Sequence, residues 1–219
     1  MPRLYNLLGA APLVVWYVWG LSEQIPVLIQ RSDTLGAGAP VGALFALQTI
    51  AQAASIAFTS FLIVLLIVRD VPRAQTRGFA PYAAAMFGTF AATSFFFLPA
   101  APLTTPLLAI ATLCIAAGLG LSLYALIYLG RSFAILPSAR TLVIDGPYRF
   151  VRHPLYLFEE VAVVGIMLQF AQPWSLLVLA AHFAAQLARM HYEEQTLTGA
   201  FPEYATYAAH TKRLIPGIY

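Results

Sequence analysis

Long apolar stretches alternate with short polar segments along the whole chain. A helix needs about 20 largely apolar residues to cross a membrane, because the hydrocarbon layer is about 30 Å thick and each residue rises about 1.5 Å. The pattern therefore predicts an all-α, multi-pass transmembrane bundle of about six helices. The six apolar stretches are Leu4–Leu21, Val41–Val68, Phe79–Leu98, Leu103–Leu129, Leu155–Phe170 and Pro173–Met190. Only Ala171–Pro173 separates the last two, which predicts a short helical hairpin.

The composition favours a membrane protein over a soluble one. Of the 219 residues, 60% are hydrophobic and 10% are charged, whereas soluble domains carry about 25% charged residues. A chain of this length cannot bury so much apolar surface internally, because small domains have a high ratio of surface to volume. The remaining apolar surface is therefore expected to face the lipid bilayer.

The positions of the cationic residues predict how the helices are oriented. Positively charged residues near membrane helices collect on the cytoplasmic side. We therefore expect both termini to be cytoplasmic, in a multi-pass protein of a bacterial inner membrane. The first stretch is expected to stay as an anchor, since no small-residue cleavage site follows it. The cations that support this orientation are Arg3, Arg69, Arg73, Arg77, Arg131, Arg140, Arg149, Arg152, Lys212 and Arg213.

The candidate chemistry is concentrated after Gly130. We expect an N-terminal four-helix region at residues 1–129, where Gly118 and Gly120 would let helices pack closely. Residues 130–219 would form a linker, the hairpin and a polar tail, with a cofactor pocket at the cytoplasmic side. The net charge of +3 without a basic run makes nucleic acid an unlikely partner. The four histidines and one cysteine lack the spacing of a metal site.

The linker contains a turn followed by a helix start. Asp145-Gly146-Pro147 is typical of a turn, and Pro154 suits the first turn of the fifth helix. Arg152 and His153 would then lie beside unpaired backbone N–H groups, where an anionic ligand group is favoured. The alternative is that Arg152 only anchors the chain at the membrane surface and His153 only caps the helix.

A second polar cluster ends the sixth helix. Arg189 and Glu193 are four residues apart and share a helix face. They could bind one ligand, because an Arg clamps a carboxylate and a Glu accepts hydrogen bonds from a diol or an ammonium, or they could form an intrahelical ion pair. Glu159 and Glu160 lie one turn inside the fifth stretch, and at most one of them can face a given site. His182, in the middle of the sixth helix, is expected to serve packing.

Two sets of residues form a recognisable pattern. The first set is Arg140-Thr141-Leu142-Val143, Gly146-Pro147-Tyr148 and Arg152-His153-Pro154-Leu155-Tyr156. The second is Arg189, Glu193-Glu194, Leu197, Phe201, Tyr204, Tyr207 and Arg213-Leu214-Ile215-Pro216. Together these motifs resemble the isoprenylcysteine carboxyl methyltransferase family, and the resemblance covers residues 130–219. Two departures from the family pattern are Phe158 and Pro202, each in place of a glycine. A bulky Phe158 would narrow the space near the cofactor or the lipid entrance.

The resemblance implies an S-adenosylmethionine-dependent methyltransferase. It implies that Arg189 is catalytic and faces the methyl-accepting group. It also implies a set of cofactor-binding residues at the positions that match the family motif. These are Arg140, Thr141, Leu142, Val143, Tyr148, His153, Pro154, Leu155, Tyr156 and Glu193.

The acceptor is expected to be a lipophilic small molecule or a prenylated substrate. A carboxylate is favoured, because it needs no general base and only a cation such as Arg189 to orient it, whereas an amine or a thiol would need deprotonation. Two other functions stay open: an NADPH-dependent membrane reductase of the steroid-reductase type, and a non-enzymatic transport or structural protein. The sequence leaves the acceptor and the oligomeric state undetermined.

Overall fold

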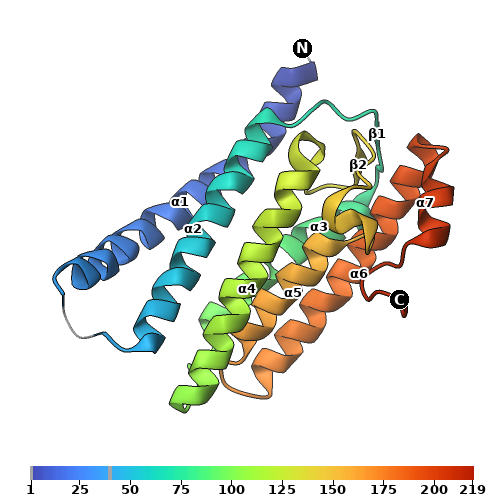
Figure 1. Ribbon diagram of the computed structural model, residues 1–219. Helices are drawn as coiled ribbons and strands as arrows, with labels where there is room; N and C mark the ends of the chain where they lie inside the picture. Colours follow the sequence, from blue (N-terminus) through green and yellow to red (C-terminus); the bar gives the residue numbers. More distant parts are fainter. Residues whose placement is uncertain (1, 39–40) are drawn as a thin grey trace.

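A computed structural model describes residues 2–38 and 41–219, with side chains from residue 6 onward, so that the side chain of Arg3 lies outside the described part. About 74% of the chain is helical (Figure 1), which confirms the all-α fold class. The helices are α1 (Pro2–Gly36), α2 (Ala43–Val68), α3 (Phe79–Phe90), α4 (Thr105–Leu129), α5 (Pro154–Met167), α6 (Trp174–Ala200) and α7 (Tyr204–His210). The shorter elements are β1 (Ala74–Gln75), β2 (Ser138–Ala139) and the 3-10 turns η1 (Ala91–Phe97), η2 (Gly130–Ser132) and η3 (Gly146–Arg149).

Three helical spans in the described ranges are long and apolar enough to cross a membrane: Asn6–Gly36, Ala43–Val68 and Thr105–Ser132. The other three predicted stretches are also helical but differ in length or polarity. Helix α3 changes to the 3-10 turn η1 after 12 residues, and α5 has only 14 residues, about 21 Å at the helical rise. The protein is therefore an integral membrane protein in which α5 is shorter than the bilayer core. The prediction of a short hairpin is wrong for its second helix, because α6 has 27 residues and continues to Ala200.

Helix α1 is longer than predicted. It has 35 residues and continues to Gly36, so the polar residues expected in a loop after Leu21 lie on the helix instead. Helix α2 supplies partners for some of them: the Arg31 guanidinium lies 5.1 Å from the ring centre of Phe45, and the Ser55 hydroxyl donates to Gln24 Oε1 at 2.7 Å. These contacts stabilise helical conformation where the local sequence alone favours a break.

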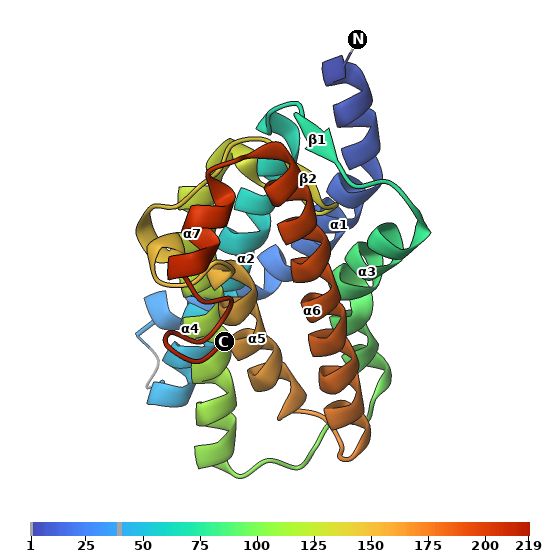
Figure 2. The same ribbon diagram turned by 90° about the vertical axis from the view of Figure 1, so that its right-hand side faces the viewer.

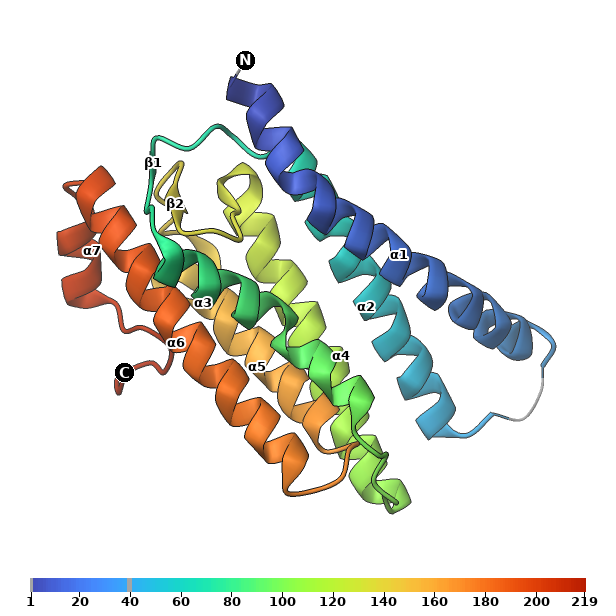
Figure 3. The same cartoon turned by 180° about the vertical axis from the view of Figure 1, so that it is seen from behind.

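The helices pack in a chain of neighbours. Helix α4 lies between α2 and α5, and α6 packs against both α5 and α3 (Figures 1 and 3). A Cβ at Gly118 would lie 2.4 Å from the backbone nitrogen of Ala162 on α5, so the prediction of close packing at Gly118 is confirmed. It is wrong for Gly120, where a Cβ would meet no described atom within 4 Å.

The linker between α4 and α5 is fixed to the loop between α2 and α3. Strands β1 and β2 pair antiparallel, with Ala74 opposite Ala139. The Arg140 Nε donates to the Asp70 carbonyl at 2.6 Å, and Arg131 pairs with the Asp70 carboxylate at 2.6 Å. This strand pair, α7 and the N-terminal end of α1 lie toward the same end of the bundle (Figures 1 and 2). That this end is cytoplasmic stays a prediction.

Candidate functional site

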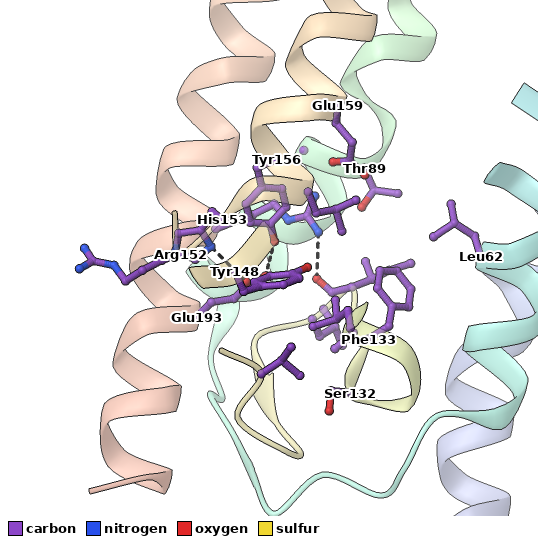
Figure 4. A pocket seen from close by; sticks show the side chains of 18 of the residues that line it. Leu62, Thr89, Ser132, Phe133, Tyr148, Arg152, His153, Tyr156, Glu159 and Glu193 are labelled. Carbon is purple, nitrogen blue, oxygen red and sulfur yellow. Dashed lines mark hydrogen bonds and ion pairs between the residues drawn. The ribbon is translucent and has the colours of Figure 1, made fainter. Parts of the chain in front are cut away.

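A cavity of about 290 Å³ lies where the linker, the hairpin and α7 meet (Figure 4). Its lining contains Arg189 and all of the predicted cofactor residues except Pro154, which is buried in the first turn of α5. Helices α1, α2 and α4 also contribute to the wall, with residues such as Tyr17, Phe58 and Leu119. One cavity therefore unites residues that are up to 53 positions apart in the predicted set, from Arg140 to Glu193.

The predicted turn positions Tyr148 in this cavity. Gly146 has a φ of +58°, a backbone conformation that glycine adopts readily and that residues with a Cβ rarely adopt. A Cβ there would also lie 2.4 Å from the Tyr128 ring. The chain then forms η3, and the Tyr148 carbonyl accepts a hydrogen bond from the Tyr207 hydroxyl at 2.6 Å. The turn thus joins the linker to the C-terminal tail.

Glu194 connects the start of α5 to the tail. One carboxylate oxygen accepts from Arg152 Nε at 2.9 Å and lies 3.2 Å from His153 Nε2, while the other accepts from Arg213 at 2.7 and 3.0 Å. The backbone supports this join, because the Arg152 N–H donates to the Lys212 carbonyl at 2.7 Å. Glu194 was not among the predicted site residues, although the adjacent glutamates and Arg213 of the family pattern were a signal for it.

The same cluster changes the interpretation of Arg152 and the protonation of Glu194. The Arg152 side chain is only 13% exposed, and in Figure 4 it extends away from the cavity centre. The largely buried Arg152 side chain joins the start of α5 to Glu194 and to the Thr211 carbonyl of the tail. It is therefore not a simple surface anchor. Burial raises the pKa of Glu194, but hydrogen bonds from His153 and Arg213 outweigh this and lower the pKa to about 2.

Glu193 turns toward the cavity. Its carboxylate accepts a hydrogen bond from the Tyr156 hydroxyl, and Oε2 lies 3.9 Å from His153 Nδ1. The two sequence stretches that were expected to meet, around His153 and around Glu193, therefore do meet (Figure 4). The two adjacent glutamates of α6 thus differ in their contacts. Glu194 joins segments of the protein, whereas Glu193 lies at the cavity and is available to a ligand.

Arg189 lies deeper in the same cavity and is 6% exposed. Its guanidinium lies 4.9 Å from the centre of the Tyr156 ring and donates to Gln186 Oε1 at 2.9 Å. In the part of the chain that the structure describes, Arg189 forms no ion pair with Glu193, and the Nε of Arg189 has no hydrogen-bond partner. Tyr156 contacts both side chains, and the alternative of an intrahelical ion pair is wrong.

The adjacent glutamates of α5 also diverge. Glu159 lines the cavity and accepts a hydrogen bond from Gln186 Nε2 at 3.2 Å. Glu160 Oε1 lies 2.8 Å from His182 Nδ1. This confirms that only one of the two glutamates faces the site. His182 is buried against Glu160, as the packing prediction required, and it also contributes to the cavity lining.

The two departures from the family pattern lie outside the cavity. Phe158 packs against the apolar core formed with α1, α2 and α4 and is not part of the cavity lining. That it narrows a lipid entrance stays a prediction. Adjacent residues of a helix point about 100° apart, and it is the neighbouring Glu159 that faces the cavity. Pro202 is exposed immediately after the end of α6, where a proline disrupts no helix.

Several polar atoms in the cavity wall are available to a ligand. The hydroxyls of Tyr148 and Tyr204 are buried and have no hydrogen-bond partner among the described residues. Burial raises the pKa of both tyrosines, so they remain hydroxyl donors at neutral pH. Buried polar groups are normally paired. The wall therefore offers the two tyrosine hydroxyls as free donors and the Glu193 carboxylate as an acceptor, next to the apolar side chains of Leu142 and Val143. This combination suits a ligand with polar and apolar parts, such as S-adenosylmethionine.

Comparison with known proteins gives matches to parts of the chain. Two curated bacterial proteins are similar over about a third of their length. The cobalt-zinc-cadmium resistance protein CzcN of Cupriavidus metallidurans is 38% identical over 77 residues, covering 35% of this chain and 36% of that protein. The nickel-cobalt-cadmium resistance protein NccN of Alcaligenes xylosoxydans xylosoxydans is 36% identical over 76 residues, covering 34% and 36%.

A protein family matches a longer stretch. Residues 106–203 match the phospholipid methyltransferase family. The match begins in α4 and ends before α7, so it contains the linker, the helical hairpin and every residue of the predicted site. The resemblance to membrane methyltransferases that the sequence motifs indicated is therefore confirmed, and residues 106–203 are similar to the phospholipid methyltransferase family.

Proposed function

We propose that the protein transfers a methyl group from S-adenosylmethionine to a lipophilic acceptor at the membrane surface. The observation that carries this proposal is the convergence of His153, Tyr156, Glu193 and Arg189 at one cavity, inside a stretch that matches a methyltransferase family. The cavity combines a ligand-binding carboxylate, free hydroxyl donors and a buried cation, which is the set of groups that this reaction needs.

The cofactor would occupy the part of the cavity between the linker and the end of α6. There the Glu193 carboxylate would accept hydrogen bonds from the ribose diol or the ammonium group. The Tyr148 and Tyr204 hydroxyls would donate to its polar atoms, and Leu142 and Val143 would cover its apolar surface. The cofactor supplies a methyl group already activated by the sulfonium, so the protein has chiefly to align the reactants and exclude water.

The acceptor would approach from the membrane side of Arg189. The wall there is formed by apolar residues of the spanning helices, including Phe58, Leu62 and Leu119, which suits a lipophilic or prenylated chain. The buried Arg189 guanidinium would orient a carboxylate for attack on the methyl group. A carboxylate is already an anion and needs no general base, so it remains the favoured acceptor.

The proposal includes a location. The cofactor is a polar cytoplasmic metabolite, and most of the cations lie in the linker, the loop between α2 and α3 and the C-terminal tail. These are Arg69, Arg73, Arg77, Arg131, Arg140, Arg149, Arg152, Lys212 and Arg213. We therefore place this end of the bundle and both termini at the cytoplasmic face of a bacterial inner membrane. The polar cofactor would enter from the cytoplasm, and the acceptor would enter from the bilayer.

A binding experiment tests the proposal. Purified protein in detergent micelles is titrated with S-adenosylhomocysteine and, separately, with NADPH, and transfer of tritium from labelled S-adenosylmethionine to a lipid extract is counted. Wild-type protein should bind S-adenosylhomocysteine, and His153→Ala and Glu193→Ala should lose that binding and the transfer. Glu203→Gln is a matched control, because this carboxylate is exposed. Binding of NADPH alone would contradict the proposal and favour a reductase.

A further inference from the structure

Gln186 lies between the two buried charges of the cavity. It is 1% exposed and sits behind the cavity wall on α6, one turn before Arg189. Its Oε1 accepts from Arg189 Nη1 at 2.9 Å, and its Nε2 donates to Glu159 Oε2 at 3.2 Å. A single side-chain amide therefore contacts the cation with its acceptor atom and the anion with its donor atom.

This arrangement keeps two opposite charges from pairing with each other. Arg189 and Glu159 line the same cavity, yet no direct ion pair joins them in the described residues. Opposite charges attract strongly where side chains are buried in a medium of low dielectric constant, and an Arg readily clamps a carboxylate through two hydrogen bonds. An ion pair between them would occupy the atoms that an acceptor needs.

The surroundings hold the Gln186 amide in place. A guanidinium only donates and a carboxylate only accepts, so one orientation of the amide satisfies both neighbours. Helix α3 closes the remaining space: a Cβ at Gly88 would lie 3.2 Å from Gln186 Oε1 and 2.7 Å from Arg189 Cδ. The Tyr156 ring limits the Arg189 guanidinium from another side.

We propose that Gln186 is a positioning residue that holds Arg189 and Glu159 apart, so that the Arg189 guanidinium stays available to the acceptor. This inference rests on the proposed function for the identity of the bound group. Its structural part, the separation of the two charges by the amide, can be tested independently.

The test first removes the Gln186 amide and then, in a second variant, also removes the negative charge of Glu159. In Gln186→Leu, Arg189 should pair directly with Glu159. A farnesylated N-acetylcysteine, which carries a carboxylate on a prenyl chain, serves as the acceptor probe in micelles. Its affinity should fall about tenfold or more, the effect expected for loss of one charge-assisted hydrogen bond, while the affinity for S-adenosylhomocysteine stays within about twofold of the wild type.

A second variant separates positioning from a merely structural role. In Gln186→Leu with Glu159→Gln, the carboxylate that the amide had held away from Arg189 is gone, and the affinity for the probe should return toward the wild-type value. A packing defect at Gln186 would persist in the double variant. Gln195→Leu is the matched control, because Gln195 is exposed on the same helix and contacts His191.

The structure of Gln186→Leu completes the test. We expect an N–O contact between Arg189 and Glu159 in that variant. Two charges that remain apart without the amide, or a double variant that binds the probe as weakly as the single one, would overturn the inference. If wild-type protein binds neither S-adenosylhomocysteine nor the probe, the proposed function fails, whereas the geometry of the variant still decides the role of Gln186.

Discussion

Adjacent residues in the site have divided roles. Glu194 accepts hydrogen bonds from Arg152 and Arg213, whereas Glu193 accepts one from Tyr156 at the cavity. On α5, Glu159 faces the cavity and Glu160 faces His182. The helical step of about 100° per residue separates the two members of each pair. Substitutions at the two members of a pair should therefore have different effects.

We expect Glu194→Gln to lower stability and Glu193→Gln to lower binding. Loss of the Glu194 charge leaves Arg152 and Arg213 partly unpaired. The Arg152 and Glu194 side chains are each only 13% exposed, so this loss should cost about 2 kcal/mol. Glu193→Gln should keep the melting temperature within about 2 °C of the wild type, a shift of less than 1 kcal/mol, and lose affinity for S-adenosylhomocysteine. Thermal unfolding and calorimetry distinguish the two outcomes. Equal losses of stability in both variants would contradict the division of roles.

The acid sensitivity of the protein should depend on Glu194. Its pKa falls from an ordinary value of 4.5 to about 2 in the folded state. A group whose pKa is lowered on folding stabilises the protein above the ordinary pKa, and this contribution is lost as the pH falls toward the folded pKa. Wild-type protein should therefore lose stability between about pH 4.5 and about pH 2.

Melting temperatures measured across that range check this dependence. Glu194→Gln should have a flatter profile than the wild type, because its side chain does not titrate. Glu203→Gln, which removes an exposed carboxylate, should follow the wild type. A Glu194→Gln profile as steep as that of the wild type would assign the acid sensitivity to other groups.

At the scale of elements, the contact between α4 and α5 holds the site together. The two helices approach so closely that a Cβ at Gly118 of α4 would overlap Ala162 of α5. On the α5 side, a Cβ at Gly165 would lie 2.5 Å from the Ala111 carbonyl oxygen of α4. Helix α5 carries Tyr156 and Glu159 into the cavity. Small residues at helix contacts are a common way to bring membrane helices together.

We expect Gly118→Ala to destabilise the protein and Gly120→Ala to leave it unchanged. Overpacking at Gly118 should cost about 2 kcal/mol, whereas a Cβ at Gly120 meets no described atom within 4 Å. The melting temperatures of the two variants in the same detergent measure this difference. Equal changes in melting temperature in the two variants would contradict the close contact of α4 and α5 at Gly118.

The sequence predicted those parts of the structure that depend on local signals. The Asp145-Gly146-Pro147 turn, the start of α5 at Pro154 and the hairpin all form as expected. The length of α1 was missed, because it depends on partners such as Phe45 and Ser55 on α2. The contacts of Glu194 and Gln186 were also missed, since they join segments far apart in the chain.

At the scale of the whole molecule, polar chemistry gathers toward one end of an apolar bundle. The strand pair and α7 lie toward that end, and the loop before α4 lies at the other (Figures 1 and 2). Spanning helices α1, α2 and α4 provide the apolar wall of the cavity. One cavity therefore joins the polar residues of that end to the apolar residues of the spanning helices.

The predicted orientation can be tested with single cysteines. Cys114 is the only cysteine, so Cys114→Ala gives a clean background for Thr104→Cys and Glu203→Cys, both at exposed positions. A membrane-impermeant maleimide should label Thr104→Cys in cells whose outer membrane is permeabilised, and should label Glu203→Cys only after the inner membrane is broken. The reverse pattern would place the cavity on the outer side.

The central claim is that the linker and the end of α6 together enclose a methyl donor. Ultraviolet crosslinking of labelled S-adenosylmethionine, followed by peptide mapping, tests it most directly. Label should appear within residues 140–156 or 189–207 and disappear with excess S-adenosylhomocysteine or in Glu193→Ala. Label confined to α1 or α2, or label that an excess of S-adenosylhomocysteine does not displace, would contradict the account.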